Sequence, residues 1–171
     1  MSHKNCKCVE CGQTGKMQEM MNKGIIENGF IVIPIVDANP PFAYTVGLTE
    51  SCGKPELIAI CNMDPMIIAK ILHELAYKVK ENSISFDEDG TIENALTYYI
   101  EEKEIKGPVG CKTVKRKYKE KYMCKCCQKY GGQENFVAKQ VIIGDLNAKL
   151  PWEEGSDKKW IREFKQKQLW S

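Results

Sequence analysis

The sequence predicts a single domain of the α+β class, in which a mostly antiparallel sheet is packed by two or three helices. A length of 171 residues suits one domain with a large core, and 43% hydrophobic against 28% charged residues is the composition of a globular protein. Short apolar runs between turn-rich segments predict strands that follow one another closely. Amphipathic patterns near the start, in the middle and at the end predict the helices.

Five apolar runs predict strands, and the first of them contains a proline. Residues Phe30 to Val36 are rich in β-branched side chains, but Pro34 cannot donate to a ladder, which favours an edge position or a bulge. A turn-rich stretch from Thr49 to Pro55 separates the second run from the third. The predicted strands cover residues 30–36, 42–48, 56–62, 95–100 and 137–143.

The clearest predicted helix begins after Asp64 and Pro65, which supply an N-cap and a first-turn proline. It runs to Glu81 and carries an apolar stripe of Ile68, Ile71, Leu72, Leu75 and Val79. Further helices are predicted over residues 16–28, 114–130 and 158–169. The chain thus divides into a cysteine-rich arm (1–15), an α+β core (16–155) and a C-terminal helix packed on the core (156–171).

The cysteine content indicates a reducing compartment. Residues 1–15 have no apolar stretch of the kind that a signal peptide needs, and no apolar run is long enough to span a bilayer. Nine cysteines in such a chain more often bind metal than form disulfides, and the odd number cannot pair completely. We therefore expect a cytoplasmic protein with no membrane partner, and a nuclear location stays open.

Two Cys-x-x-Cys pairs predict one structural Zn²⁺. Zinc takes four thiolates tetrahedrally, and two thiols three positions apart can bind one ion from a single turn. The pairs are Cys8 with Cys11 and Cys124 with Cys127, so the ion would tie the N-terminal arm to a later basic segment. Cys6 and Cys126 are alternative ligands. Incidental pairs or a redox tail are the competing interpretations, although a thioredoxin-type site normally follows a strand.

Charge is unevenly distributed along the chain. Residues 112–129 hold eight basic residues against Glu120, and residues 81–104 hold eight acids against Lys103. Tyrosines lie among the basic residues of this stretch. Basic side chains bind the phosphates of nucleic acids and aromatic rings stack on their bases, so the stretch is a candidate nucleic-acid surface. The nucleic-acid candidates are Lys115, Arg116, Lys117, Lys119 and Lys121. A solvated helix face, or a surface paired with the acidic segment, is the alternative.

No hydrolytic or nucleotide-binding motif is present in the sequence, which contains neither GxSxG, nor a P-loop, nor HExxH. Both histidines lie where they suggest no catalysis, His3 in the arm and His73 on the polar side of a helix. The leading prediction is therefore a non-enzymatic, zinc-binding interaction module whose partner is a protein or a nucleic acid.

The segment Phe42-Ala-Tyr-Thr-Val-Gly-Leu48, followed by Gly53-Lys-Pro-Glu-Leu57, resembles the central signature of a family of bacterial and viral proteins catalogued as domain of unknown function 4262. Three further stretches agree with this signature, namely residues 27–30, 139–143 and 150–155. Family members also often begin with a Cys-x-x-Cys pair, which Cys8 and Cys11 match. The resemblance implies an α+β fold and no established activity. Lys54 stands where members commonly have histidine, so a role that needs that imidazole does not carry over.

The resemblance also implies one candidate surface for a small ligand or a substrate. Its residues come from separate parts of the chain and are expected to converge on a pocket: Tyr44, Thr45, Gly47, Glu56, Trp152 and Glu153. An enzyme or a small-ligand receptor that uses this pocket is the alternative function. The competing interpretation assigns Gly47 and the Pro151-Trp152 pair to turns and core packing.

Overall fold

The fold was obtained as a computed structural model that describes residues 15–171, with side chains from residue 19 onward. The strands are β1 (Ile31–Ile35), β2 (Phe42–Val46), β3 (Glu56–Ile60), β4 (Gly90–Ile100), β5 (Lys103–Thr113) and β6 (Ala138–Ile143). The helices are α1 (Gly15–Asn28), α2 (Leu48–Cys52), α3 (Pro65–Lys80), α4 (Arg116–Tyr122), α5 (Cys124–Tyr130) and α6 (Lys158–Phe164), with a 3₁₀ turn at Gln133–Asn135.

All six strands form one sheet in the order β1-β2-β3-β6-β5-β4. Every neighbouring pair is antiparallel except β3 and β6, which run parallel. The predicted α+β domain with a mostly antiparallel sheet is therefore confirmed. Pro34 lies on β1, an edge strand, which is one of the two positions that its missing N–H group predicted.

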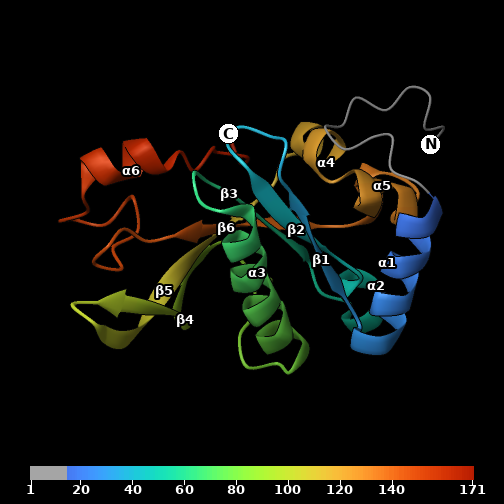
Figure 1. The fold of residues 1–171 in the computed structure, drawn as a ribbon, viewed down its shortest axis with the longest axis horizontal. Coiled ribbons are helices and arrows are strands. Elements are labelled where there is room, and N and C mark those ends of the chain that lie inside the picture. The colour runs from blue at the N-terminus through green and yellow to red at the C-terminus, as the bar shows by residue number, and fades with distance from the viewer. Residues whose placement is uncertain (1–14) are drawn as a thin grey trace.

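The sheet is covered on both faces at its centre. Ala43, Leu57 and Ala59 pack with the buried stripe of α3 on one face, whereas Tyr44 and Ile58 pack with α1, α4 and α5 on the other. Figure 1 shows α3 in front of the sheet and the other three helices at the end opposite the β4–β5 hairpin. Because β2 and β3 are buried on both faces, their sequences read as continuous apolar runs.

Several predicted boundaries need correction. The strand β5 was missed, and the helix predicted over residues 114–130 is broken at Met123, whose φ of −117° and ψ of 52° lie outside the helical region. The short helix α2 occupies part of the predicted turn. The last helix ends at Phe164 because Lys165 takes a left-handed conformation. Among the described helices, none is long and apolar enough to cross a membrane.

Candidate functional site

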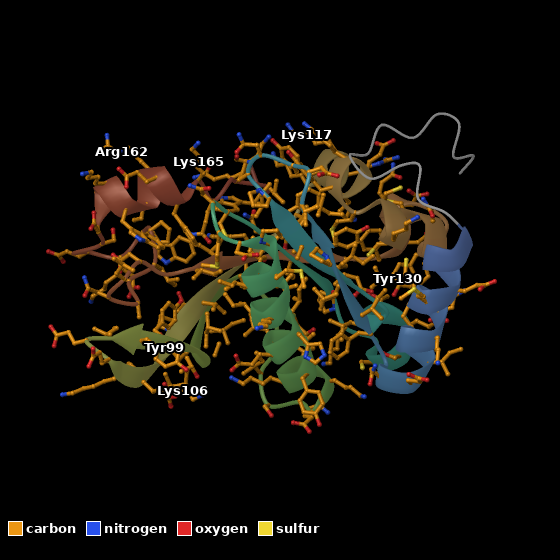
Figure 2. All side chains as sticks on the ribbon, in the orientation of Figure 1. Tyr99, Lys106, Lys117, Tyr130, Arg162 and Lys165 are labelled. Atoms are coloured by element: carbon orange, nitrogen blue, oxygen red, sulfur yellow. The ribbon has the colours of Figure 1, made fainter. Side chains whose placement is uncertain are left out.

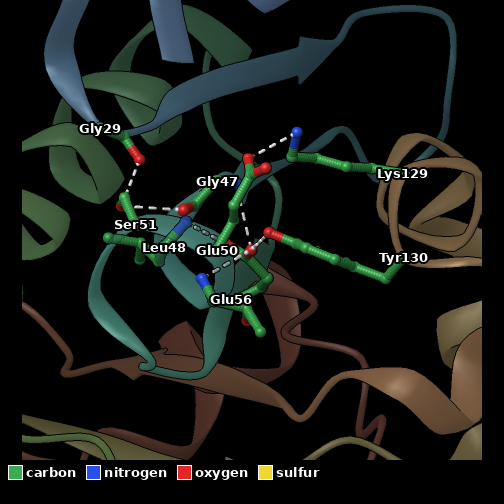
Figure 3. A network of polar contacts seen from close by, with 9 residues as sticks. Gly29, Gly47, Leu48, Glu50, Ser51, Glu56, Lys129 and Tyr130 are labelled. Carbon is green, nitrogen blue, oxygen red and sulfur yellow. Dashed lines mark hydrogen bonds and ion pairs between the residues drawn. The ribbon is translucent and has the colours of Figure 1, made fainter. Parts of the chain in front are cut away.

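Glu56, the first residue of β3, is completely buried and stands at the centre of a polar network. Its carboxylate accepts five hydrogen bonds, from Thr45 Oγ1 at 2.8 Å, Gly47 N at 3.1 Å, Leu48 N at 3.2 Å, Thr49 N at 3.2 Å and Tyr130 Oη at 2.6 Å. Figure 3 shows the carboxylate between the Gly47–Leu48 turn and the Tyr130 hydroxyl. The family signature thus supplies both the acceptor and most of its donors.

Gly47 is required by the geometry of this turn. Its φ of 115° is one that residues with a Cβ rarely adopt, and a Cβ there would lie 2.8 Å from the carbonyl oxygen of Gly29. With this conformation the chain leaves β2 and enters α2, so three successive N–H groups point at Glu56. The glycine of the signature therefore serves to bring backbone donors onto a buried acid.

The donor set favours the ionised form of Glu56, whereas burial opposes it. The Thr45 hydroxyl accepts from Leu57 N at 2.8 Å, which leaves its own proton for Glu56. Burial is the largest influence and raises the pKa of Glu56, while the bonds from Tyr130, Thr49, Thr45 and Gly47 lower it. Burial and the neighbouring carboxylate raise the pKa of Tyr130, which keeps its hydroxyl protonated as a donor.

The helix α5 is attached to the signature at both of its ends. Near its start, Lys125 N donates to the Tyr44 hydroxyl at 3.1 Å, and the Cys126 thiol donates to the Thr45 carbonyl at 3.2 Å. At its end, Tyr130 reaches Glu56 and the neighbouring Lys129 forms an ion pair with Glu50 at 2.7 Å. The position of α5 and the position of the signature turn are therefore coupled.

Half of the predicted zinc site lies on α5. Cys124 and Cys127 are 1% and 3% exposed, and their spacing of three residues places them on the same side of the helix. The Gln128 side chain donates to Cys124 Sγ at 2.9 Å, as outer-sphere donors do for metal-bound thiolates. Cys126 is directed to β2 instead.

The other half of the predicted zinc site falls on the N-terminal arm. Cys8 and Cys11, together with the alternative ligand Cys6, lie outside the described residues. Residues 15–171 by themselves hold no group of three or more side chains suited to a metal ion. The zinc hypothesis therefore rests on the α5 pair and on the spacing of the N-terminal pair.

The pocket predicted from the resemblance is not formed by the described residues. Tyr44, Thr45 and Glu56 are fully buried, whereas Trp152 lies against Gly110 of β5, where a Cβ would approach the indole to 2.3 Å. Strand pairing places β5 three strands away from β2, a separation of roughly 14 Å. Glu153 accepts from Leu150 N within its own turn. The geometry fits the competing interpretation, in which these residues serve turns and packing.

The predicted basic stretch contributes four exposed cations from α4 and the residue before it: Lys115, Arg116, Lys117 and Lys121. The fifth candidate, Lys119, is directed into the protein instead, because its ammonium donates to the Phe136 carbonyl at 2.8 Å and burial lowers its pKa. None of the salt bridges within residues 15–171 joins these cations to the acidic segment 81–104.

Two tryptophans far along the chain lie beside this stretch. The Lys112 ammonium is 5.0 Å from the ring centroid of Trp152 and 5.9 Å from that of Trp170. The buried Gln140 holds the C-terminal segment in place by donating to the Lys167 carbonyl at 2.6 Å and accepting from Leu169 N at 2.8 Å. We call this set the basic–aromatic surface: Lys112, Lys115, Arg116, Lys117, Lys121, Trp152, Lys167 and Trp170.

Sequence reasoning missed Tyr130 as a partner of Glu56 and both tryptophans as partners of Lys112. Tyr130 is 74 residues from Glu56, and nothing local to either residue indicates the contact. The tryptophans follow the basic stretch at distances along the chain that carry no periodic signal. Two tertiary features bring the tryptophans to Lys112. They are the pairing of β5 with β6 and the hydrogen bonds by which Gln140 binds the C-terminal segment.

The fold and the network define an α+β protein in which a sequence signature builds a buried carboxylate centre. A family model described as Domain of unknown function (DUF4262) matches residues 24–157, and the chain belongs to this family. The matched range includes Glu56 and Tyr130 but begins after Cys8 and Cys11. No curated protein and no solved structure matches the chain.

Proposed function

We propose that this protein is a non-enzymatic module that binds single-stranded nucleic acid through the basic–aromatic surface. The observation that carries the proposal is the pair of indoles beside Lys112. The segment that bears Trp170 is joined to α4, because Lys115 N donates to the Leu169 carbonyl and the Lys167 ammonium to the Tyr122 hydroxyl. An enzyme or receptor built on Tyr44, Glu56 and Trp152 is disfavoured, because the first two are fully buried and the third lies three strands away.

The cations suit a phosphate backbone. Lys115, Arg116, Lys117 and Lys121 are exposed, and they form none of the salt bridges within residues 15–171. Figure 2 shows Lys117, Lys165 and Arg162 along one edge of the molecule, so positive charge extends from α4 to α6 in this view. A backbone that follows this edge would release counterions at each contact.

The aromatic rings favour single strands over a duplex. Trp152 is 44% exposed, and its ring rests on β5 at Gly110, which holds the indole in place. A fixed, partly exposed indole offers a face on which an unpaired base can stack, whereas bases in a duplex are stacked on one another. Lysines beside such rings complete the arrangement that single-strand binding surfaces use.

Fluorescence anisotropy with a labelled 20-nucleotide oligothymidine, titrated between 20 and 200 mM salt, tests the proposal. Changing Lys115, Arg116, Lys117 and Lys121 to glutamine should reduce the slope of log K against log salt by about 0.7 for each cation that contacts a phosphate. Trp152→Ala should weaken binding about 5- to 150-fold, because base stacking contributes about 1–3 kcal/mol.

The matched control is the double variant Lys103→Gln and Lys106→Gln, which removes exposed lysines from the β4–β5 hairpin. Figure 2 shows Lys106 on the edge of the molecule opposite Lys117. We expect this control to bind as the unchanged protein does. An absence of binding at 20 mM salt, or an equal loss in the hairpin variant, would contradict the proposal.

We further propose that one Zn²⁺ stabilises this module through Cys8, Cys11, Cys124 and Cys127. The support is the buried α5 pair, whose spacing of three residues places both cysteines on one side of the helix, and the amide donor on Cys124. A bound ion would supply no chemistry beyond cross-linking the chain. Because the closed loop would span more than one hundred residues, it would stabilise the fold by several kcal/mol in the chain-entropy model.

Native mass spectrometry of protein purified without added metal tests the zinc hypothesis. We expect a mass increment of one zinc per chain, which Cys127→Ser should abolish. Cys61→Ser is the matched control, because Cys61 is equally buried but lies at the end of β3, away from α5. Metal-free protein in which all nine thiols react after unfolding would overturn the hypothesis.

A further inference from the structure

A cleft of about 590 Å³ opens on the face of the sheet that α3 covers. Its walls come from α3, the β4–β5 hairpin, the turn after β6 and α6, and they include Ile67, Ile71, Tyr98, Tyr99, Leu146 and Trp160. Figure 2 shows the labelled Tyr99 on the hairpin beside α3. The volume lies in the range of small-molecule sites, and the lining is predominantly apolar and aromatic.

The cleft lies where the two parallel strands end. Met63 follows β3 after a short turn, and Gly144 to Leu146 follow β6 directly, and these residues line the cleft. In sheets with parallel strands, crevices outside the carboxyl ends of those strands are the preferred ligand sites. This position belongs to the opposite face from the basic–aromatic surface, so the two sites are separate.

The walls are held in place without a ligand. The Tyr98 hydroxyl donates to the Pro108 carbonyl at 2.8 Å and accepts from Gly144 N at 2.9 Å. Asp145 accepts from the backbone of Asn147, Lys149 and Asp157, and Trp160 stacks on Phe164 with centroids 4.2 Å apart. The site is therefore preformed, which lowers the entropic cost of binding.

The charges around the cleft differ in whether they already have partners. Glu74 is paired with Lys78 at 3.0 Å, Glu104 accepts from the Tyr99 hydroxyl at 3.3 Å, and Asp145 is occupied by its own turn. Lys70 is exposed on the lining, and it forms none of the ion pairs found within the described chain. Glu104 and Asp145 are thus satisfied by hydrogen-bond donors, whereas Lys70 is the charge among the described lining residues with neither an ion pair nor a side-chain hydrogen bond, and it is positive.

We propose that this cleft binds a small amphipathic ligand with a flat apolar body, whose single anionic group pairs with Lys70. The aromatic and aliphatic walls take the flat body, and the ammonium at the rim takes the anion. Nothing in this assignment depends on the basic–aromatic surface or on zinc.

Two probes that differ by one sulfonate test the proposal. We would measure binding of 8-anilinonaphthalene-1-sulfonate and of uncharged N-phenyl-1-naphthylamine, each by fluorescence and by calorimetry for stoichiometry. Both should bind one per folded chain. Lys70→Gln should weaken the sulfonate about two- to fivefold, the effect of an exposed ion pair, and leave the uncharged probe unchanged.

Matched variants on α3 and α6 locate the site. Ile67→Glu places a charge on the apolar wall and should weaken both probes, whereas Met66→Glu, at the adjacent exposed residue outside the lining, should weaken neither. Lys159→Gln is the control for Lys70, because Lys159 is exposed on α6 and does not line the cleft. All variants must retain cooperative unfolding, since partly unfolded chains also bind these dyes.

Three outcomes would overturn the proposal. Non-stoichiometric binding would show that no defined site exists. If Lys70→Gln weakened the binding of both probes equally, or of neither, the assignment of an anionic group to the ligand would be wrong. A monomer–dimer equilibrium in sedimentation that Ile67→Glu abolishes would assign this cleft to a second copy of the chain instead.

Discussion

Glu56 shows how one residue can hold a turn. A buried carboxylate costs several kcal/mol unless it is paired or well hydrogen-bonded. Within the described part of the chain Glu56 forms no ion pair, and five donors from β2, the Gly47–Thr49 turn and α5 stabilise it instead. Three of those donors are backbone N–H groups at the start of the short helix α2. Groups at a helix N-terminus have no acceptor within the helix, and Glu56 supplies one.

The raised pKa of Glu56 predicts a stability profile of definite sign. The folded protein holds this proton more tightly than the unfolded chain, whose glutamate titrates near 4.5. The resulting stabilisation is complete below about pH 4.5 and is lost as the pH rises through the folded pKa. Between neutral pH and about 4.5, Glu56 should therefore make the free energy of unfolding increase as the pH falls.

Urea denaturation of the unchanged protein and of Glu56→Gln at several pH values measures this contribution. The variant should lose the increase in that window and should be less stable throughout, by about 1–3 kcal/mol for each backbone donor left without an acceptor. Burial raises the pKa of Asp89, but hydrogen bonds from Lys139 and Thr113 outweigh burial and lower this pKa to about 2, so Asp89 titrates in a separate range. Parallel profiles for the two proteins would show that folding does not raise the pKa of Glu56.

Among the elements, α5 links the signature turn to the cysteine pair. One α-helix over residues 114–130 was predicted, and the break at the fully buried Met123 gives α5 a direction of its own. Tyr130 and Cys126 then reach Glu56 and Thr45 from that direction. A change that moves Cys124 and Cys127 should therefore also shift the Gly47–Thr49 turn.

Tyr130→Phe tests this link without altering the packing of the ring. The phenyl ring can keep its contact with Phe136, whose centroid lies 5.6 Å away, while the 2.6 Å hydrogen bond to Glu56 is lost. We expect the free energy of unfolding to fall by about 0.5–1.5 kcal/mol, the net contribution of a typical hydrogen bond. Denaturation in urea at neutral pH measures the change.

Tyr118→Phe is the matched control for this prediction. Tyr118 lies on α4 and packs on Tyr122, with ring centroids 6.3 Å apart, and its hydroxyl makes none of the hydrogen bonds found within residues 15–171. Its substitution should change stability by less than about 0.5 kcal/mol. Equal decreases in the free energy of unfolding for the two variants would show that the hydrogen bond from Tyr130 to Glu56 does not stabilise the fold.

The β4–β5 hairpin shows why one strand was missed. Its tip consists of Glu101 and Glu102, both with positive φ, where hairpin turns usually carry asparagine or glycine. The first residues of β5, Lys103 to Lys106, are exposed and largely polar, so neither the turn nor the strand had a clear signal. The pairing of β5 with β4 and β6 provides the stabilisation that local propensity lacks.

At the scale of the whole molecule, the order of the strands decides which residues meet. β6 follows β5 in the chain but lies between β5 and β3, where it pairs parallel to β3. This insertion separates Trp152 from Tyr44 and creates the carboxyl-end cleft beside α3. Neither consequence could be predicted from motifs, because motif residues carry no information about strand order.

The sequence by itself determined the features that depend on local chemistry. Hydrophobic periodicity and capping residues predicted α3, apolar runs predicted five of the six strands, including the central β2, β3 and β6, and Pro34 predicted an edge or a bulge. The signature from Phe42 to Leu57 indicated the family, and the family match confirms it.

Only the tertiary structure decided what those features are for. The meeting of Glu56 with Tyr130, the position of Trp152 beside Lys112, and the cleft at Lys70 all join segments that are distant along the chain. Such contacts arise because strand pairing and helix packing bury surface cooperatively across the whole domain. A pattern within one segment reports only the conformation of that segment.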